Sequence, residues 1–147
     1  MEYRELIADF AAKVGLEDFA PNEEGVCQLI DENMVITIQD CEEIGLILIT
    51  APMAKLPART AAVLLRRLLA ANFLYEKTMG ATIALDDTSG MLYLTRYDAL
   101  GQLDGEKLKA HIESFATVLD QWQHELVPVV LGNAAANAKS GRKKALK

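Results

Sequence analysis

The segment from Thr60 to Tyr75 constrains the fold more strongly than any other part of this sequence. It is nearly all apolar, and on a helical wheel its apolar arc covers roughly 220°, about twice the stripe of an ordinary surface helix. Arg59, Arg66 and Arg67 mark the remaining side. We therefore expect one half of the arc to pack on the chain's own sheet and the other half to be buried in a homodimer. Such a protein works by offering surface to other chains.

Length and composition favour a single domain of ordinary size. The 147 residues are enough to bury a core, and the longest uncharged apolar run, from Ile44 to Met53, is too short to span a bilayer. The first residues lack the basic-then-apolar layout of a signal peptide, so we predict a cytoplasmic protein without membrane insertion. Cys27 and Cys41 match no zinc or redox spacing, and we expect both to be free thiols.

The net charge hides a split between the body of the chain and its C-terminus. The whole chain carries −6, and five cations after residue 138 contribute +5, so that residues 1–138 carry −11. An acidic body of this kind repels nucleic acid. We predict one α+β domain over residues 1–132 and a disordered basic tail over residues 133–147. Two interpretations of the tail stay open: contact with RNA or an anionic membrane, and a dispensable solvated terminus.

Hydrophobic periodicity predicts an α+β fold with the order helix, three strands, helix, two strands, helix. Apolar residues recur at helical spacing over residues 2–14 and again over residues 108–126. Asp104 is placed to cap the last helix, which Pro128 should end or kink near Val127. The expected strands, which form an antiparallel sheet packed with helices, are Val26–Ile30, Met34–Gln39, Ile44–Ala51, Ala81–Leu85 and Met91–Tyr97.

Short connections fix the pairing that we expect between the first three strands. They place Ile30 opposite Met34, and Gln39 opposite Ile44. Side chains alternate between the faces of a strand. One face then carries an obvious core, made of Val26, Ile30, Met34, Ile36, Ile38, Ile47 and Ile49. The other face carries Cys27, Leu29, Val35, Thr37, Leu46 and Leu48. This second face is mostly apolar, so either another helix of the chain or a partner covers it.

No pattern in the sequence indicates catalysis, a metal ion or a cofactor. His111 and His124 lie on different sides of the last helix and cannot share a metal ion. Nucleophile, phosphate-loop and dinucleotide motifs are absent, so we predict a protein that is not an enzyme. Asp86 and Asp87 lack the ligand ladder of a calcium loop and indicate a turn. A carboxylate site assembled by the fold stays open, and Asn72 is interpreted as a structural amide, with a ligand contact as the alternative.

The order of elements, the small size and the acidic character resemble the Tir chaperone family, the class I chaperones of type III secretion. The resemblance is strongest from Leu65 to Leu94, with the pattern Leu-Leu-x-x-Leu-Leu-x-x-Asn, a glycine, an alternating strand, and an Asp/Gly turn before another strand. It covers residues 1–131 and leaves out the basic tail. It implies a cytoplasmic homodimer without ATPase activity. Such a protein binds the N-terminal region of an effector as an extended chain, keeps it secretion-competent and helps to deliver it to the export machinery.

By position, the resemblance also implies roles for two sets of residues. The second helix forms much of the dimer contact in the family, which implicates Leu64, Leu68, Ala71 and Tyr75. Effector contact involves the first helix and the sheet, which implicates Leu6, Phe10, Leu29, Val35, Leu46 and Leu48. A core position is the alternative for Phe10. The alternative function is a small α+β protein-binding module outside secretion, which would hold a folded protein or a small apolar ligand on the same face.

Overall fold

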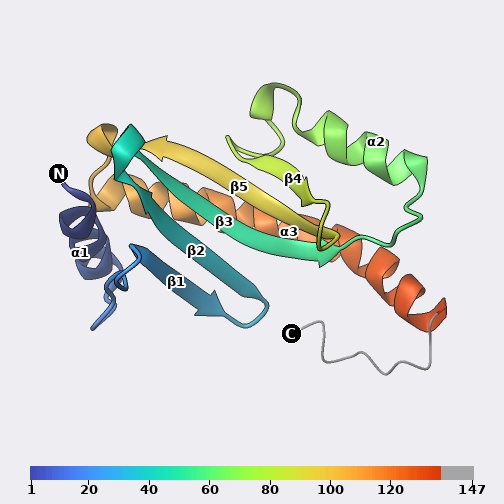
Figure 1. The fold of residues 1–147 in the computed structure, drawn as a ribbon, viewed down its shortest axis with the longest axis horizontal. Coiled ribbons are helices and arrows are strands. Elements are labelled where there is room, and N and C mark those ends of the chain that lie inside the picture. Colours follow the sequence, from blue (N-terminus) through green and yellow to red (C-terminus); the bar gives the residue numbers. More distant parts are fainter. Residues whose placement is uncertain (137–147) are drawn as a thin grey trace.

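The structure, a computed structural model, describes the backbone of residues 1–136 and the side chains of residues 1–126. The predicted order of helices and strands is confirmed (Figure 1). The elements are α1 (Tyr3–Val14), β1 (Val26–Asp31), β2 (Met34–Cys41), β3 (Leu46–Lys55), α2 (Ala62–Ala71), β4 (Thr82–Asp86), β5 (Met91–Ala99) and α3 (Gly105–Ala136). Three short 3₁₀ turns lie between them, η1 (Glu42–Ile44), η2 (Phe73–Tyr75) and η3 (Leu100–Gln102).

The five strands form one antiparallel sheet in the order β1-β2-β3-β5-β4, so β1 and β4 are its two edges. In Figure 1, α3 runs behind the sheet, α1 lies at one end of it, and α2 lies beside β4. α2 contacts α3 through Arg67, whose guanidinium pairs with Glu125 and lies 5.9 Å from the centre of the Trp122 ring. α1 contacts the first turn of α3. The helices therefore gather on one side of the sheet.

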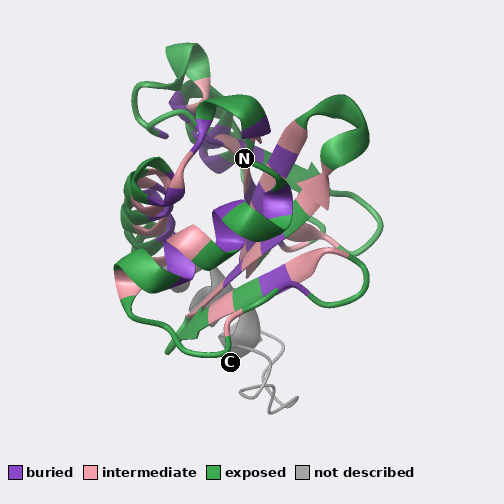
Figure 2. Ribbon diagram, turned by 90° about the vertical axis from the view of Figure 1, so that its left-hand side faces the viewer, coloured by how far each residue is buried: buried purple, intermediate pink, exposed green. Residues whose placement is uncertain are grey.

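One continuous core lies between these helices and one face of the sheet. Ile38, Ile47, Ile49 and Leu94 are completely buried on the sheet side. The helices contribute Leu6, Ile7, Phe10, Leu108, Phe115 and Leu119, all at most 2% exposed. In Figure 2, buried and exposed stretches alternate along the helices, as expected when one side faces a core. Removal of this apolar surface from water is the main force that stabilises the fold.

The junction between α1 and α3 depends on a contact that the sequence did not suggest. Asp104 caps α3 as predicted, because its Oδ1 accepts a hydrogen bond of 2.8 Å from the Lys107 N–H. In addition, Asp9 Oδ2 accepts a hydrogen bond of 2.7 Å from the Gly105 N–H. A Cβ atom on Gly105 would lie 2.6 Å from the backbone carbonyl carbon of Asp9. The two helices approach this closely because residue 105 is glycine.

The predicted pairing of β1 with β2 was wrong by one residue. Asp31, and not Ile30, lies opposite Met34, because the hairpin turn has two residues and not three. A slip of one residue exchanges the faces of a strand. Cys27 and Leu29 therefore face the helices, whereas Val26 and Ile30 face away from them.

The predicted pairing of β2 with β3 was wrong by four residues. Gln39 lies opposite Leu48, because residues 42–44 form η1 and Gly45 turns the chain with φ of 70°. An even shift leaves every side chain on the same face of the strand. Ile47 and Ile49 consequently keep their predicted place in the core.

Two elements extend beyond their predicted ends. β3 continues through Pro52 to Lys55, and the pairing with β5 shifts just after the proline, which cannot donate a backbone hydrogen bond. α3 continues past Pro128 to Ala136, so of the two predicted outcomes, an end or a kink near Val127, the end was wrong. One proline removes a single backbone hydrogen bond from a long helix. The predicted tail thus begins within this helix, and residues 137–147 lie outside the described part of the chain.

α2 is shorter than the predicted helix, which extended to Tyr75. It ends at Ala71, and Leu74 in η2 adopts a left-handed conformation with φ of 60°. This reversal directs the chain back toward β4. The end of the apolar segment is therefore a turn that leads into the sheet.

Candidate protein-binding surface

The face of the sheet that points away from the helices contains no buried residue. Val26, Gln28 and Gln39 point to this side as well; we use the name uncovered face for its residues Ile30, Val35, Thr37, Leu46, Leu48, Thr50, Tyr93, Thr95 and Tyr97. Cross-strand pairing brings Leu48 beside Tyr97, and Ile30 beside Val35. The Tyr97 side chain is 59% exposed. The sequence left open whether a helix or a partner covers this face, and the described helices lie on the opposite side (Figure 1).

None of the nine residues of the uncovered face carries a charge. A sheet face that meets water is usually polar, because each strand then alternates apolar and polar side chains. The charged residues on this side of the sheet, Lys55 and Asp86, lie at its end opposite Met91. An exposed surface with few charges is the kind that proteins use to bind other chains.

The edge of the sheet at β1 has free backbone groups. Both backbone groups of Val26 bond to Asn22: the Val26 N–H donates to Asn22 Oδ1 at 3.0 Å, and the Val26 carbonyl accepts from the Asn22 N–H at 2.9 Å. Because backbone direction alternates along a strand, the groups of Gln28 and Ile30 point to the same side. They have no hydrogen-bond partner among the described residues. We call Gln28 and Ile30 the open edge.

The edge at β4 is different, because a side chain occupies it. The Ile83 N–H donates to Asn72 Oδ1 at 2.8 Å, and Asn72 Nδ2 donates to the Ile83 carbonyl at 3.1 Å. The Ala81 N–H also donates to the carbonyl of Thr78, at 3.1 Å. The interpretation of Asn72 as a structural amide is confirmed, although its partner is a sheet edge.

A cavity of about 380 Å³ lies beside the open edge. Its lining comes from β1 and from the loop before it, namely Asp18, Phe19, Ala20, Asn22, Val26, Cys27 and Gln28. Burial raises the pKa of the Cys27 thiol, so this group stays protonated at neutral pH. The cavity therefore presents a mixed apolar and polar lining next to free backbone groups.

A second cavity, of about 580 Å³, lies between the loop just before β1 and the end of β2, and it is acidic. Five carboxylates line it, from Glu23, Glu24, Asp40, Glu42 and Glu43, against one cation, Arg4. Tyr3 forms part of its wall, and the Tyr3 hydroxyl donates to the carbonyl of Ile38 at 3.2 Å. Burial raises the pKa of the Tyr3 phenol, which keeps this anchor of α1 protonated. The cavity favours cationic side chains by its charge.

α2 carries a second apolar surface, directed to solvent. We call it the outward α2 surface; it comprises Leu65 (40% exposed) and Leu69 (73%) of α2, and Phe73 (73%), Leu74 (73%) and Tyr75 (54%) of the turn η2 that follows. The opposite side of α2 packs in the core, as expected for half of the apolar arc. That buried side contains Leu64, Leu68 and Ala71, three of the four residues implicated in dimer contact. Tyr75 is the fourth and is exposed.

The six residues implicated in effector contact fall into two groups. Val35, Leu46 and Leu48 lie on the uncovered face, with Val35 near the β1–β2 turn and the two leucines at the other end of β2. Leu6 and Phe10 are buried in the core, which is the alternative that the sequence left for Phe10, and Leu29 faces the helices after the change of register. Sequence analysis missed Tyr93 and Tyr97, which β5 contributes to the same face. The alternation of Leu92 and Leu94 with Tyr93 along β5 was the signal that could have identified them.

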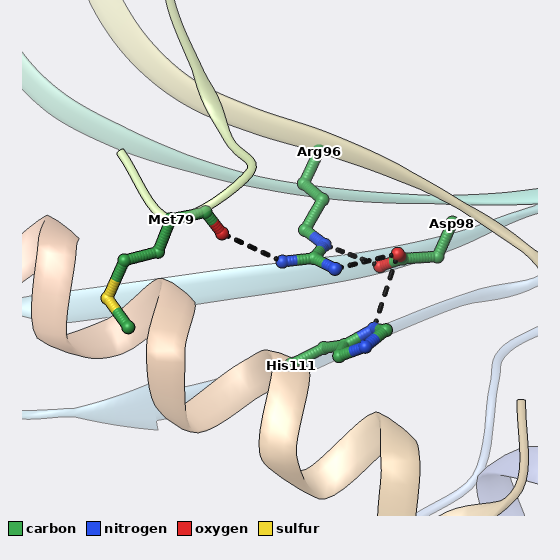
Figure 3. Close-up of polar contacts among 4 residues, drawn as sticks. All are labelled: Met79, Arg96, Asp98 and His111. Carbon is green, nitrogen blue, oxygen red and sulfur yellow. Dashed lines mark hydrogen bonds and ion pairs between the residues drawn. The ribbon is translucent and has the colours of Figure 1, made fainter. Parts of the chain in front are cut away.

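A cluster of partly buried charges in the described chain holds structure. Arg96 donates from Nε and Nη2 to the two carboxylate oxygens of Asp98, at 2.8 and 3.0 Å, and from Nη1 to the Met79 carbonyl at 3.1 Å (Figure 3). His111 Nδ1 lies 3.2 Å from Asp98 Oδ1. The cluster fixes the loop before β4 to β5 and α3. Among the described residues, no group of three or more His, Cys, Asp or Glu side chains is placed to hold a metal ion.

None of the helices in the described part of the chain is both long enough and apolar enough to cross a membrane.

Comparison with known proteins identifies a family whose model matches this chain. The model of the Tir chaperone protein (CesT) family matches residues 5–123. A comparison with curated protein sequences finds no match. A chain of the HopA1–SchA chaperone–effector complex is similar in structure, with a TM-score of 0.70 and 19% identity over 83% of this chain and 93% of that chain.

Two further solved structures share the architecture. A chain of the ExsC–ExsE complex has a TM-score of 0.68 and 23% identity, over 82% of this chain and 90% of that chain. A chain of the Yersinia pestis type III secretion chaperone SycH in complex with a stable fragment of YscM2 has a TM-score of 0.67 and 20% identity, over 82% of this chain and 99% of that chain. At these identities the likeness shows a common fold.

Proposed function

Because the chain belongs to the Tir chaperone protein (CesT) family, we propose that it is a cytoplasmic type III secretion chaperone. It binds the N-terminal region of an effector as an extended chain, keeps that region secretion-competent and presents it to the export machinery. It acts as a homodimer and needs neither a catalytic step nor a cofactor. The uncharged uncovered face next to an open strand edge is the observation that carries this proposal.

An extended client chain fits the open edge by its backbone. The N–H and carbonyl groups of Gln28 and Ile30 offer up to four hydrogen bonds to an added strand. Backbone hydrogen bonds do not depend on the client's sequence, so they suit a chaperone that holds an unfolded segment. The client's side chains supply selectivity, because one of them enters the cavity beside Phe19 and Val26.

The uncovered face then provides the area that binding needs. An unfolded client loses conformational entropy when it is ordered, and burial of apolar surface must offset that loss. Leu46, Leu48 and Tyr97 offer apolar surface without charges that would have to be desolvated. The acidic cavity and the acidic body favour a client with basic residues near the bound segment.

The outward α2 surface supports the proposal of a homodimer. Leu69 and Phe73 are each 73% exposed on a helix, and a two-fold axis through such a surface buries the same residues on both protomers. This assignment replaces Leu64, Leu68 and Ala71, which the protomer's own core already buries. Tyr75 stays in the proposed interface.

The client-binding proposal is tested by the double variant Leu46→Asp with Leu48→Asp. Two charges on the uncovered face should weaken client binding by at least about 100-fold, while the dimer is retained. The client is first identified by purifying the tagged protein from its own host under secretion-inducing conditions, with mass spectrometry of the co-purifying chains. Affinity is then measured by calorimetry with the purified N-terminal segment.

A matched control adds two charges elsewhere. Leu16 and Leu85 are exposed apolar residues outside the uncovered face, so Leu16→Asp with Leu85→Asp should leave affinity unchanged. Normal binding by the Leu46 and Leu48 variant would remove the uncovered face from the proposal. A co-purifying partner that resists protease along its whole length is folded, and that result would favour the protein-binding module outside secretion.

A further inference from the structure

A five-stranded open sheet has two edges, and either edge can in principle accept an added strand. The outward-facing backbone groups at this edge belong to Ile83 and Leu85 of β4 and to Ala81, just before it, since Ile83 is bonded to the Asn72 side chain and direction alternates along the strand. On β1 the outward groups belong to Val26, Gln28 and Ile30. Each edge therefore has three outward-facing residues, but the two edges differ in which of these residues are already hydrogen-bonded within the protein.

The Asn72 amide makes the two hydrogen bonds that a residue of a neighbouring strand would make. Its Oδ1 accepts from the Ile83 N–H at 2.8 Å, and its Nδ2 donates to the Ile83 carbonyl at 3.1 Å. A side-chain amide has the same donor and acceptor as a peptide group, so it can take the place of a strand. Ile83 is the middle one of the three outward residues, and its occupation leaves no two consecutive sites on β4.

The rest of the structure holds Asn72 in this position. Asn72 follows Ala71, which is 2% exposed and packs in the core. In the loop just before β4, the Met79 carbonyl accepts a hydrogen bond of 3.1 Å from Arg96, which is itself held by Asp98 (Figure 3). The chain that links α2 to β4 is thereby fixed at both ends, which keeps the backbone of Asn72 beside β4.

At the β1 edge, a side-chain amide is bonded to only the first of the three outward-facing residues. Asn22 bonds to both backbone groups of Val26, and no described residue bonds to the outward groups of Gln28 and Ile30. Two consecutive sites therefore stay available on β1. Asn22 also defines where an added strand must stop.

We propose that Asn72 is a specificity-determining residue that closes the β4 edge to strand addition and leaves β1 as the edge that accepts an extended chain. The partner at β1 is the client of the proposed function, on which this part of the inference rests. Closure of β4 has a second consequence that does not depend on a client. It prevents protomers from pairing edge to edge through β4.

The test uses the full-length protein without client and compares it with Asn72→Ala. Loss of the amide should expose the Ile83 N–H, whose hydrogen exchange measured by NMR should become about tenfold faster. The variant should also form assemblies larger than those of the wild type at about 100 µM, as measured by light scattering after size exclusion. Unchanged Ile83 exchange together with an unchanged assembly size would overturn the proposal.

A second substitution separates edge pairing from general destabilisation. Leu85 is exposed on the same edge, and a lysine on an edge strand opposes pairing with another strand. Adding Leu85→Lys to Asn72→Ala should therefore restore the wild-type assembly size, whereas it cannot restore the Ile83 hydrogen bonds. Large assemblies that persist in the double variant would arise from another surface and would contradict the proposal.

A third variant covers the case in which Asn72→Ala does not fold. Asn72→Asp keeps the acceptor for the Ile83 N–H and loses the donor for the Ile83 carbonyl. It should give intermediate exchange and intermediate assembly, and wild-type behaviour in both would overturn the proposal. Client affinity is measured separately, so a protein that binds no client but assembles on loss of Asn72 would refute the proposed function and retain this inference.

Discussion

Adjacent residues of β3 have the same chemistry and opposite environments. Ile47 and Ile49 are completely buried beneath the helices, whereas Leu46 and Leu48 lie partly exposed on the uncovered face. Both faces are apolar, so hydrophobicity does not distinguish the protein's own core from a surface for a partner. The difference comes from where the helices lie. An apolar sheet face without a helix over it is the place to look for another chain.

The difference between the two faces of β3 predicts that Ile49→Ala causes the largest loss of stability. This substitution leaves a cavity among close-packed side chains, and we expect the free energy of unfolding to fall by about 2–5 kcal/mol. Urea denaturation followed by circular dichroism measures it. A loss as small as that of a surface substitution would show that the two faces of β3 are not different.

The next largest loss of stability is expected at the junction between α1 and α3. Gly105→Ala places a Cβ atom 2.6 Å from the Asp9 backbone carbonyl carbon, so the helices must separate, at a cost of about 1–3 kcal/mol. Urea denaturation again gives the value. The control is Gly101→Ala, because nothing lies within 4 Å of a Cβ atom there. Equal stability of the two variants would argue against the close approach.

A smaller effect should appear in acid at the same junction. The hydrogen bond from the Gly105 N–H lowers the pKa of Asp9 below its ordinary value of 3.8, and Lys13 adds to this. Asp9 therefore stabilises the fold above about pH 4 and loses this contribution as the pH falls further. Asp9→Asn should be less stable than the wild type at pH 6, and the difference should shrink by pH 3. Urea midpoints at both pH values test this, and a constant difference would contradict it.

The smallest effect on stability is expected for Leu48→Ala on the uncovered face. Because the side chain is partly exposed in the free protein, we expect a change of about 0.5 kcal/mol. Client binding should nevertheless weaken measurably by calorimetry. A large loss of stability with normal client binding would reverse the roles that we assign to the two faces.

The sequence predicted the parts of the fold that depend on local patterns. The order of elements, the cap at Asp104, the turn over residues 86–90 and the core positions Ile47 and Ile49 follow from periodicity and turn chemistry. The β1 register did not follow, because a turn of two or three residues looks the same in sequence and each gives a different face. Because of this shift by one residue, the prediction placed Leu29 on the face away from the helices and Ile30 in the core, whereas the structure has the reverse.

Positions on α2 show the same limit. The sequence identified an apolar arc too wide for one partner, but it assigned Leu64, Leu68 and Ala71 to the dimer and not to the core. An arc of this width can be rotated about its axis without violating the pattern. In the structure the helix is rotated so that Leu64, Leu68 and Ala71 are buried, and Asn72 and Arg67 bond to β4 and α3 in that orientation.

The sequence by itself thus determined that this is an α+β protein with more apolar surface than its own core can use, since composition and periodicity are local properties. Only the tertiary structure decided which apolar surfaces and which strand edges stay uncovered by the rest of the protein. The closed edge at Ile83, the open edge at Gln28 and Ile30, and the uncovered face each depend on contacts between residues distant in the chain. Backbone groups carry no sequence signal, so their availability is set only when the strands and helices have packed.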